Sequence, residues 1–473
     1  MNAGISDITN WLDHLILIYS VTIMLSYAGI WVVSGFALRR HKRKERNREY
    51  EKAVTSPFEL AVSVIAPCYN EADSIVENIK ALMHIHYNNY EVIIVNDGSS
   101  DKSLERAIEA YEMERVHFYD SQRIATKRVR GVYHSSNPAY HNLILVDKEN
   151  GGKADALNAG INVSDKEHIV CIDVDSIIEP DALLKLARPF LEQSGRRVIA
   201  TGGVVHLANS CLVQNGRLVK RRVPVKILPR IQVLEYARAF LMGRIAWSSM
   251  NGLMIISGAL GMFDKEILIH AGGYLTGTVG EDMELIVRMR RYMYEQKLPH
   301  RVSYIPDPLL WTEAPEDLRT LGRQRNRWMR GTMDTLFFHR RMFLNPAYGS
   351  LGMTGYPYWL VFEWMAPWVE VLGLVYFVVL MVLGSINWHF FLFLLGFIYV
   401  FAVTFSFFAI LYQELTFPLY RKGSQIMKLF LSALVEPFFY HFMNVYWSLK
   451  GNISWFRGQK DWGAMERTGF DSK

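Results

Sequence analysis

Apolar and polar positions divide the chain into three parts. A long apolar run covers residues 12–38 and is followed at once by the basic stretch 39–44. From about residue 57 to residue 331, short β-branched runs alternate with charged stretches of helical period. Long apolar runs return after that point. This order predicts an α/β domain with a mostly parallel sheet, placed between membrane-spanning helices.

The first apolar run predicts a retained transmembrane helix. At 1.5 Å per residue it can cross a hydrocarbon core of ~30 Å, and the basic residues after it place the next domain in the cytoplasm. A cleaved signal peptide does not fit, because the start carries Asp7 and Asp13 and its apolar core would span only roughly 7 to 15 residues. We expect residues 1–11 outside the cytoplasm and a basic cytoplasmic linker at 39–56.

The apolar tail predicts a membrane platform. Phenylalanines beside basic residues at 332–344 favour an interfacial helix within the segment 332–356. Two spans are expected at 358–383 and 389–411, inside a transmembrane and re-entrant region that covers 357–449.

The third apolar run, 426–447, is interrupted by Glu436 and Pro437. A full crossing would put the basic tail 450–473 outside the cytoplasm, whereas a helical hairpin broken at Pro437 would keep it inside. We predict the hairpin and a cytoplasmic C-terminus.

Composition agrees with a membrane-bound protein. Half of the 473 residues are hydrophobic, and the formal net charge is +6. The basic residues lie beside the apolar runs, as the positive-inside tendency requires, and we find no nucleic-acid motif. Three scattered cysteines indicate neither a disulfide framework nor a zinc site, and they suit a reducing compartment. Residues 231–244 have an amphipathic pattern, and we expect that helix to serve packing alone.

Two predicted strands, 62–66 and 91–95, end in polar loops. Tyr69 and Glu71 follow the first strand, and Asp97 follows the second. Ligands of open α/β sheets bind at the carboxyl ends of the strands, so these side chains should line one edge. Taken alone, the sequence after the second strand fits an ordinary turn with a helix cap better than a ligand site.

Two more predicted strands end in groups suited to a diphosphate and a metal ion. The glycine pair before Lys153 lets the backbone approach a phosphate, which the lysine would neutralise. Asp173 and Asp175 follow the strand 168–172, and two such carboxylates repel each other unless a cation lies between them. Oxygen ligands and a diphosphate favour Mg²⁺ or Mn²⁺.

Two further groups complete the set of candidate residues. Glu281 and Asp282 stand at a predicted helix start, where they could act in catalysis or only favour the helix dipole. Gln324, Arg327 and Trp328 form a Q-x-x-R-W run that suits a phosphate and a sugar face. The competing interpretation is a basic helix lying on anionic lipid.

In this order the motifs resemble those of the membrane-embedded processive synthases of glycosyltransferase family 2, which make poly-N-acetylglucosamine, chitin, hyaluronan and cellulose. The resemblance covers about residues 62–328. It implies a GT-A fold, the nucleotide-diphospho-sugar transferase fold, over 57–331. One departure is Gly280, where many members have Thr before Glu-Asp.

The resemblance also implies roles for the residues. Nucleotide binding would fall to six side chains: Tyr69, Glu71, Asp97, Lys153, Asp173 and Arg327. Asp175, with Asp173 nearby, would hold the divalent ion. Asp282 would be the general base beside Glu281, and Gln324 and Trp328 would bind the acceptor.

We therefore predict a multi-pass enzyme of the inner or plasma membrane whose catalytic domain is cytoplasmic. It would move a sugar with inversion from a nucleotide-sugar donor, UDP-GlcNAc or UDP-Glc, to a growing β-linked polysaccharide and couple growth to export. One alternative is a single addition to a lipid carrier, and another is an inert membrane sensor. The sequence specifies neither an accessory export subunit nor a homo-oligomer.

Overall fold

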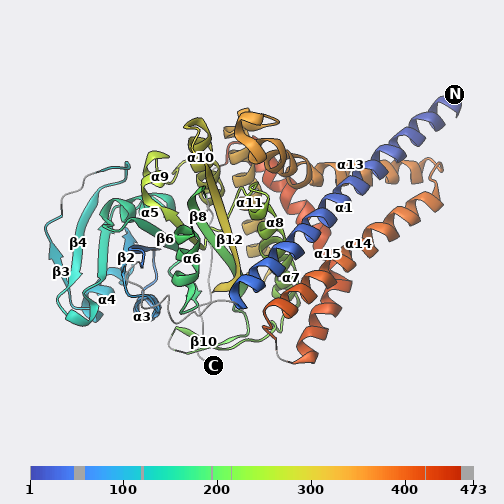
Figure 1. Cartoon of the computed structure of the whole chain (residues 1–473). Coiled ribbons are helices and arrows are strands. Elements are labelled where there is room, and N and C mark those ends of the chain that lie inside the picture. Colours follow the sequence, from blue (N-terminus) through green and yellow to red (C-terminus); the bar gives the residue numbers. More distant parts are fainter. Residues whose placement is uncertain are drawn as a thin grey trace.

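The computed structural model describes residues 2–46, 59–118, 122–192, 195–214, 216–420 and 422–459. Most of the expected linker and C-terminal tail lies outside these ranges. The described chain forms an α/β domain, from which apolar helical segments project on one side (Figure 1).

A ten-stranded mixed sheet forms the centre of the domain, in the order β3-β4-β5-β2-β1-β6-β11-β8-β12-β7. Its strands are β1 (Val62–Cys68), β2 (Tyr90–Asp97), β3 (Met113–Val116), β4 (Val129–Ser135), β5 (Leu143–Lys148), β6 (His168–Ile172), β7 (Ile177–Ile178), β8 (Arg197–Leu207), β11 (Leu260–Asp264) and β12 (His300–Thr312). A separate hairpin joins β9 (Leu212–Gln214) and β10 (Arg217–Lys220). The sheet is less parallel than predicted. Strands β5, β2, β1 and β6 are parallel, whereas β11 and β4 pair with this central group in the antiparallel sense.

Helices cover the sheet and carry the candidate motifs. They are α3 (Ile75–Met83), α4 (Ser103–Ala110), α5 (Lys153–Val163), α6 (Ala182–Leu191), α7 (Ile227–Tyr236), the π-helix η2 (Ala237–Gly243), α8 (Arg244–Ser249), α9 (Lys265–His270), α10 (Glu281–Glu295) and α11 (Leu318–Phe338). Short 3-10 turns occur at η1 (Pro138–Tyr140), η3 (Arg340–Met342) and η4 (Pro346–Tyr348).

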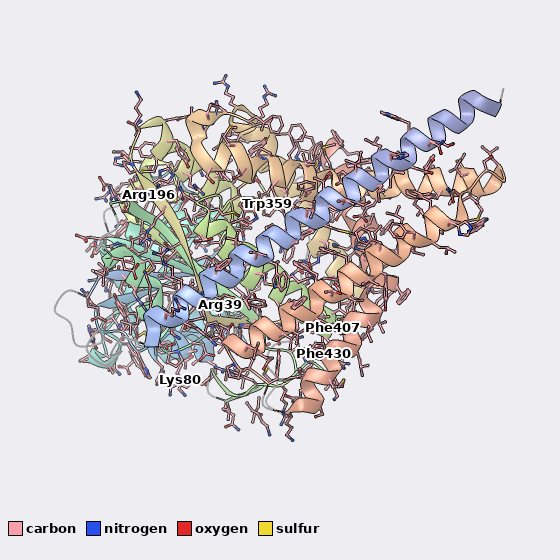
Figure 2. All side chains as sticks on the ribbon, turned by 45° about the vertical axis from the view of Figure 1, so that its right-hand side comes forward. Arg39, Lys80, Arg196, Trp359, Phe407 and Phe430 are labelled. Atoms are coloured by element: carbon pink, nitrogen blue, oxygen red, sulfur yellow. The ribbon has the colours of Figure 1, made fainter. Side chains whose placement is uncertain are left out.

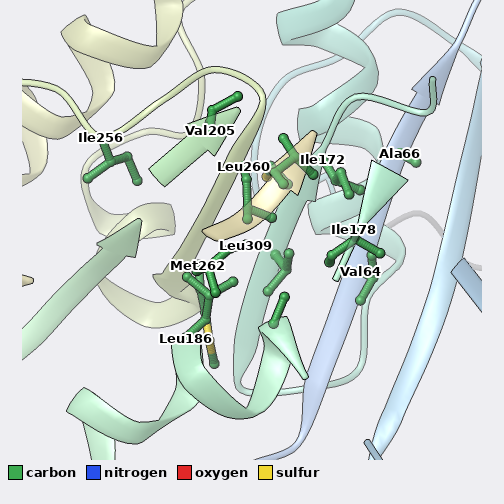
Figure 3. Close-up of a cluster of buried hydrophobic side chains, with 14 of the residues drawn as sticks. Val64, Ala66, Ile172, Ile178, Leu186, Val205, Ile256, Leu260, Met262 and Leu309 are labelled. Atoms are coloured by element: carbon green, nitrogen blue, oxygen red, sulfur yellow. The ribbon is translucent and has the colours of Figure 1, made fainter. Parts of the chain in front are cut away.

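The core lies between the sheet and its covering helices. Val64 of β1, Ile172 of β6 and Met262 of β11 are at most 1% exposed and meet in one apolar cluster (Figure 3). Leu186 of α6 and Leu309 of β12 close this cluster. Central strands that are buried on both faces explain the continuous apolar runs in the sequence.

Among the described residues, four helical segments are long and apolar enough to cross a membrane. They are α1 (Asn2–Arg46), the segment η5–α12–η6–α13 (Leu351–Gly355, Tyr356–Tyr358, Trp359–Trp364, Ala366–Val382), α14 (Trp388–Thr416) and α15 (Gly423–Phe456). The first is longer than the predicted span, because residues 39–46 of the expected linker continue the helix. Phe407 of α14 packs edge-on against Phe430 of α15 at 4.7 Å between ring centroids (Figure 2).

Two predictions about the tail are wrong. No separate interfacial helix begins at residue 332, because residues 332–338 are the last turns of α11. The hairpin broken at Pro437 is also absent, since α15 runs unbroken through this proline. Side chains on both sides hold it in place: Glu436 pairs with Arg238, and the Tyr440 hydroxyl donates to Glu235.

The end of α14 and the end of α15 both lie close to the α/β domain. At the end of α14, the carbonyl of Leu415 accepts from Lys42 of α1, whose neighbour His41 pairs with Asp307 of the domain. At the end of α15, the Trp455 indole donates to Asp334 of α11 at 2.7 Å. The last turns of α15 therefore rest on the domain that carries the candidate motifs.

Candidate active site

The loops after β1 and β2 are bound to each other at the carboxyl edge of the sheet. Ser103 accepts a hydrogen bond from the Glu71 amide at 2.8 Å, and Asp101 accepts one from the Ala72 amide at 3.0 Å. Tyr69 projects beside them with 52% of its surface exposed. The two predicted loops thus meet as expected, and they leave an aromatic side chain open to a ligand.

Asp97 holds the glycine loop. Its carboxylate is 3% exposed and accepts hydrogen bonds from the amides of Gly151 and Gly152 at 2.9 and 2.8 Å. It also pairs at 2.6 Å with the buried Lys148, which pairs equally closely with Asp155. The observed role of Asp97 is to shape the loop that leads into α5, and its contact with a uridine stays a prediction.

Lys153 begins α5 and points at the D-x-D segment after β6. Its ammonium group donates to Asp173 and, at 2.9 Å, to the carbonyl of Gly258. Burial lowers the pKa of Lys153, but the carboxylates of Asp173, Glu281 and Asp282 outweigh it and raise the pKa above its ordinary value. Lys153 therefore stays charged, and its contact with a diphosphate stays a prediction.

Glu281 and Asp282 form the first turn of α10 beside this lysine. Glu281 is 4% exposed, and burial raises its pKa to about 7, with Lys153 opposing and Asp282 supporting the shift. Asp282 is less buried and lies against Gly258, where an added Cβ would come within 2.9 Å of its carboxylate. Glycine at position 258 therefore lets the Asp282 carboxylate keep its position, because an added Cβ would force that carboxylate to shift.

Arg327 reaches the same place from α11. Burial lowers its pKa, while Glu281, Asp173 and Asp282 act in the opposite direction. Lys153 contacts Asp173 and the carbonyl of Gly258, and Gly258 lies against Asp282. Together with Glu281 and Arg327, which feel these charges, they form one charged cluster. Four separate segments supply it, so the fold unites motifs that are far apart in the sequence.

Gln324 and Trp328 stand on the same helix at the edge of this cluster. The Gln324 side-chain oxygen is buried and has no hydrogen-bond partner among the described residues. Trp328 is 39% exposed, and the guanidinium carbon of Arg325 lies 4.1 Å from its ring centroid. This arrangement contradicts the interpretation of 319–330 as a helix that only lies on lipid, because Leu321, Arg325 and Arg330 are buried.

The residues present fit a divalent ion that is shared with a substrate. Asp173 and Asp175 supply hard oxygen ligands at the end of β6. Within the described part of the chain, no group of three or more His, Cys, Asp or Glu side chains could hold a metal alone. A diphosphate would therefore have to complete the coordination, as is usual for Mg²⁺.

The comparison with known families agrees with this geometry. The family described as Glycosyltransferase like family 2 matches residues 59–331, which is more than half of the chain. The chain belongs to this family. It is a glycosyltransferase, and its α/β domain has the GT-A type of fold.

Among its relatives are poly-beta-1,6-N-acetyl-D-glucosamine synthases of Staphylococcus. The protein from Staphylococcus epidermidis is 26% identical over 307 residues, which is 65% of this chain and 63% of the relative. The protein from Staphylococcus aureus strain MSSA476 is 26% identical over 309 residues with the same coverage. The matched region therefore spans less than two thirds of these relatives.

A solved structure with a similar fold is the mannosyltransferase PcManGT from Pyrobaculum calidifontis, in complex with GDP-Man and Mn²⁺. It is 18% identical and covers 90% of this chain and 99% of its own, with a TM-score of 0.49.

Sequence analysis missed several residues of this glycosyltransferase site. Lys148 looks like the polar end of a strand, yet it is fully buried between Asp97 and Asp155. The Asp-Lys pair 147–148, directly after the apolar run 143–146, is the signal that could have found it. Gly258 lies against Asp282, a contact that depends on tertiary packing and leaves no signal in the sequence.

Proposed function

We propose that this glycosyltransferase transfers a sugar from a nucleoside diphosphate donor to a β-linked polysaccharide, with inversion at the anomeric carbon. The observation that carries the proposal is the convergence of Lys153, Asp173, Glu281, Asp282 and Arg327 in one cluster. A cluster with both charges suits a reaction that needs a base on one side and charge neutralisation on the other.

Donor binding would use the cationic part of the cluster. Lys153 and Arg327 would neutralise the diphosphate, and Tyr69 and Glu71, with Asp97 behind them, would form the nucleoside side of the site. Asp175, with Asp173 nearby, would hold Mg²⁺ or Mn²⁺, which supplies positive charge against the charge that develops on the leaving diphosphate.

Catalysis would use the acidic part. A sugar hydroxyl is a weak nucleophile, so Asp282 would take its proton as the oxygen attacks the anomeric carbon. The bond from that carbon to the diphosphate breaks in the same displacement. Attack from the opposite face turns an α-linked donor into a β-linked product. Glu281, with its raised pKa, would keep Lys153 and Arg327 placed without adding a second full negative charge.

The acceptor would be a growing glycan that meets Trp328 and Gln324. An exposed indole beside a buried amide offers an apolar sugar platform and a hydrogen-bonding group. The names of the staphylococcal relatives favour a polysaccharide and, as donor, UDP-GlcNAc ahead of UDP-Glc. A single addition to a lipid carrier would use the same residues. A sensor would have no need of Asp282.

The enzyme would sit in the inner or plasma membrane with its catalytic domain in the cytoplasm. The basic end of α1 follows its apolar part, as the positive-inside tendency requires. Because the last turns of α15 rest on α11, we place residue 459 on the same side as the catalytic domain. The cytoplasmic placement of the C-terminal end thus no longer depends on the predicted hairpin at Pro437. Export of the product through the membrane helices belongs to the same proposal.

The test is an assay of purified protein with a panel of nucleotide sugars and Mg²⁺ or Mn²⁺, in which both the released nucleoside diphosphate and the size of the product are measured. A polymer made from UDP-GlcNAc supports the proposal. A product that carries one added sugar on a lipid would establish the first alternative, and no transfer from any donor would support a sensor.

A further inference from the structure

Three helices meet behind Trp328 in a closed set of hydrogen bonds. Arg325 of α11 donates from Nη2 to Glu235 of α7 at 2.7 Å. The Tyr440 hydroxyl of α15 donates to the same carboxylate oxygen at 2.7 Å, and it accepts from Arg325 at 3.3 Å. Arg325 is 4% exposed and Tyr440 is 3% exposed, whereas the Glu235 side chain is 22% exposed, so the triad is buried on the side of Arg325 and Tyr440.

The triad acts on Trp328 through Arg325. The guanidinium carbon lies 4.1 Å from the indole centroid, which is the geometry of a cation–π contact. The Nε and Nη1 atoms of Arg325 are buried and have no hydrogen-bond partner in the described part of the chain. The indole is therefore a main contact of this guanidinium besides the triad, and the bonds to Glu235 and Tyr440 fix the guanidinium against which the indole rests.

We propose that Arg325, Glu235 and Tyr440 are positioning residues that fix the Trp328 ring for the acceptor sugar. This proposal rests on the proposed function, in which Trp328 meets the acceptor. Helix α15 would then complete the acceptor site by supplying Tyr440, in addition to anchoring the protein in the membrane. On this proposal, residues 231–244 do more than pack, because Glu235 in this segment positions Arg325.

Contacts outside the triad also hold α15 against its neighbours. Docking of α15 therefore does not depend on the triad alone. Arg238 pairs with Glu436 through both of its terminal nitrogens. Farther along α15, the Trp364 indole donates to Asn452 at 2.8 Å. A buried ion pair contributes little net stability, because desolvation offsets its attraction. The Arg325–Glu235 pair is thus better explained by the orientation that it imposes.

The first experiment compares Tyr440→Phe with the control Trp364→Phe. Each removes one aromatic donor at an α15 contact, and the control is distant from the triad. UDP-GlcNAc is the probe, and the measured quantity is UDP released per sugar incorporated into product. If the Trp328 ring is less firmly held, the acceptor sugar binds less well and more of the donor is hydrolysed by water. The ratio of UDP released to sugar incorporated should therefore rise in Tyr440→Phe by about two- to thirtyfold, which corresponds to the energy of a cation–π contact.

UDP affinity with Mn²⁺ should stay unchanged in both variants. Arg325→Lys, which keeps the charge and loses the planar fork, should raise the ratio as Tyr440→Phe does. Equal ratios in wild type, Tyr440→Phe and Trp364→Phe would overturn the positioning role, whereas an inactive wild type would contradict the proposed function.

The second experiment does not depend on turnover. Protein labelled with 5-fluorotryptophan gives a fluorine resonance for Trp328, assigned by its loss in Trp328→Phe. Tyr440→Phe should shift or broaden this resonance, and Trp364→Phe should leave it in place. An unmoved Trp328 resonance in Tyr440→Phe would overturn the proposal even if the enzyme made no product.

Discussion

Gly280 and Gly331 face each other across the contact between α10 and α11. A Cβ added to Gly280 would lie 2.5 Å from the Gly331 Cα, and one added to Gly331 would lie 2.6 Å from the Gly280 Cα. This backbone contact brings the helix start with Glu281 and Asp282 against the helix with Arg327 and Trp328. It also gives a physical reason for Gly280, where many family members have Thr.

Gly280→Thr should therefore impair this chain, although it restores the commoner residue of the family. The added side chain must push α10 away from α11, and overpacking of this kind costs about 1 to 3 kcal/mol. We expect a lower melting temperature and a larger loss of turnover, since the catalytic groups separate. Gly277→Ala is the control, because nothing lies within 4 Å of its added Cβ. Wild-type turnover in Gly280→Thr would show that the contact has no catalytic importance.

Asp175→Asn should abolish metal-dependent nucleotide binding. A neutral amide is a poorer ligand for a hard cation than a carboxylate, and Asp173 alone is already held by Lys153. Calorimetry with UDP and Mn²⁺ measures the loss, and the same titration without metal is the control. Undiminished metal-dependent affinity would remove Asp175 from the metal site.

Trp328→Ala should spare nucleotide binding and impair transfer, because the indole stands at the acceptor side. Isothermal titration with UDP and a transfer assay at saturating donor separate the two effects. Weakened UDP affinity together with normal transfer would place Trp328 at the donor end.

The raised pKa of Glu281 predicts a pH-dependent stability difference. Burial moves this pKa from a usual value of 4.5 to about 7, so the folded protein disfavours the charged form. Below pH 4.5 the carboxyl is protonated in both states and carries no penalty. The unfolded chain ionises first as the pH rises, so the folded state loses stability up to about pH 7, above which the penalty is complete.

Glu281→Gln should remove this penalty. The melting temperature of Glu281→Gln, relative to that of wild type, should rise between pH 4.5 and 7. Above pH 7 the difference should stay constant. Glu295→Gln, at the exposed end of the same helix, is the control for the same change of side chain. A constant difference between Glu281→Gln and wild type across the whole range would contradict the raised pKa.

The sequence predicted the parts of the site that depend on local pattern. Apolar strands followed by polar loops placed Tyr69, Asp97 and Asp173 at strand ends, because the carboxyl ends of parallel strands share an edge. It could not predict that Asp97 turns inward to Lys148 and the glycine loop, since that choice depends on which buried cation is nearest in space.

The sequence also could not predict the contacts between helices that are distant along the chain. The proline of α15 argued for a break, but ion pairs and hydrogen bonds to α7 and η2 hold the helix through it. Gly280 looked like a simple departure from the family until its partner, Gly331, was known. Both cases join residues separated by long stretches of chain, for which no periodicity gives a signal.

In the proposed reaction, Asp282 takes the acceptor proton. Asp282→Asn keeps nearly the same volume and removes the basic lone pair, so we expect unchanged UDP affinity and a turnover lowered on the order of 10²- to 10⁴-fold. If Asp282 only favoured the helix terminus, the same change would cost about 0.3 to 1 kcal/mol of stability and spare the rate. Asp317→Asn is the control, since Asp317 caps α11 by accepting from the Thr320 amide at 2.8 Å.

The decisive measurement is turnover per folded molecule of Asp282→Asn, taken with its melting temperature and UDP affinity in one preparation. If Asp282 is the general base, turnover collapses while UDP binding and folding are retained. Wild-type turnover beside a lowered melting temperature would contradict this role.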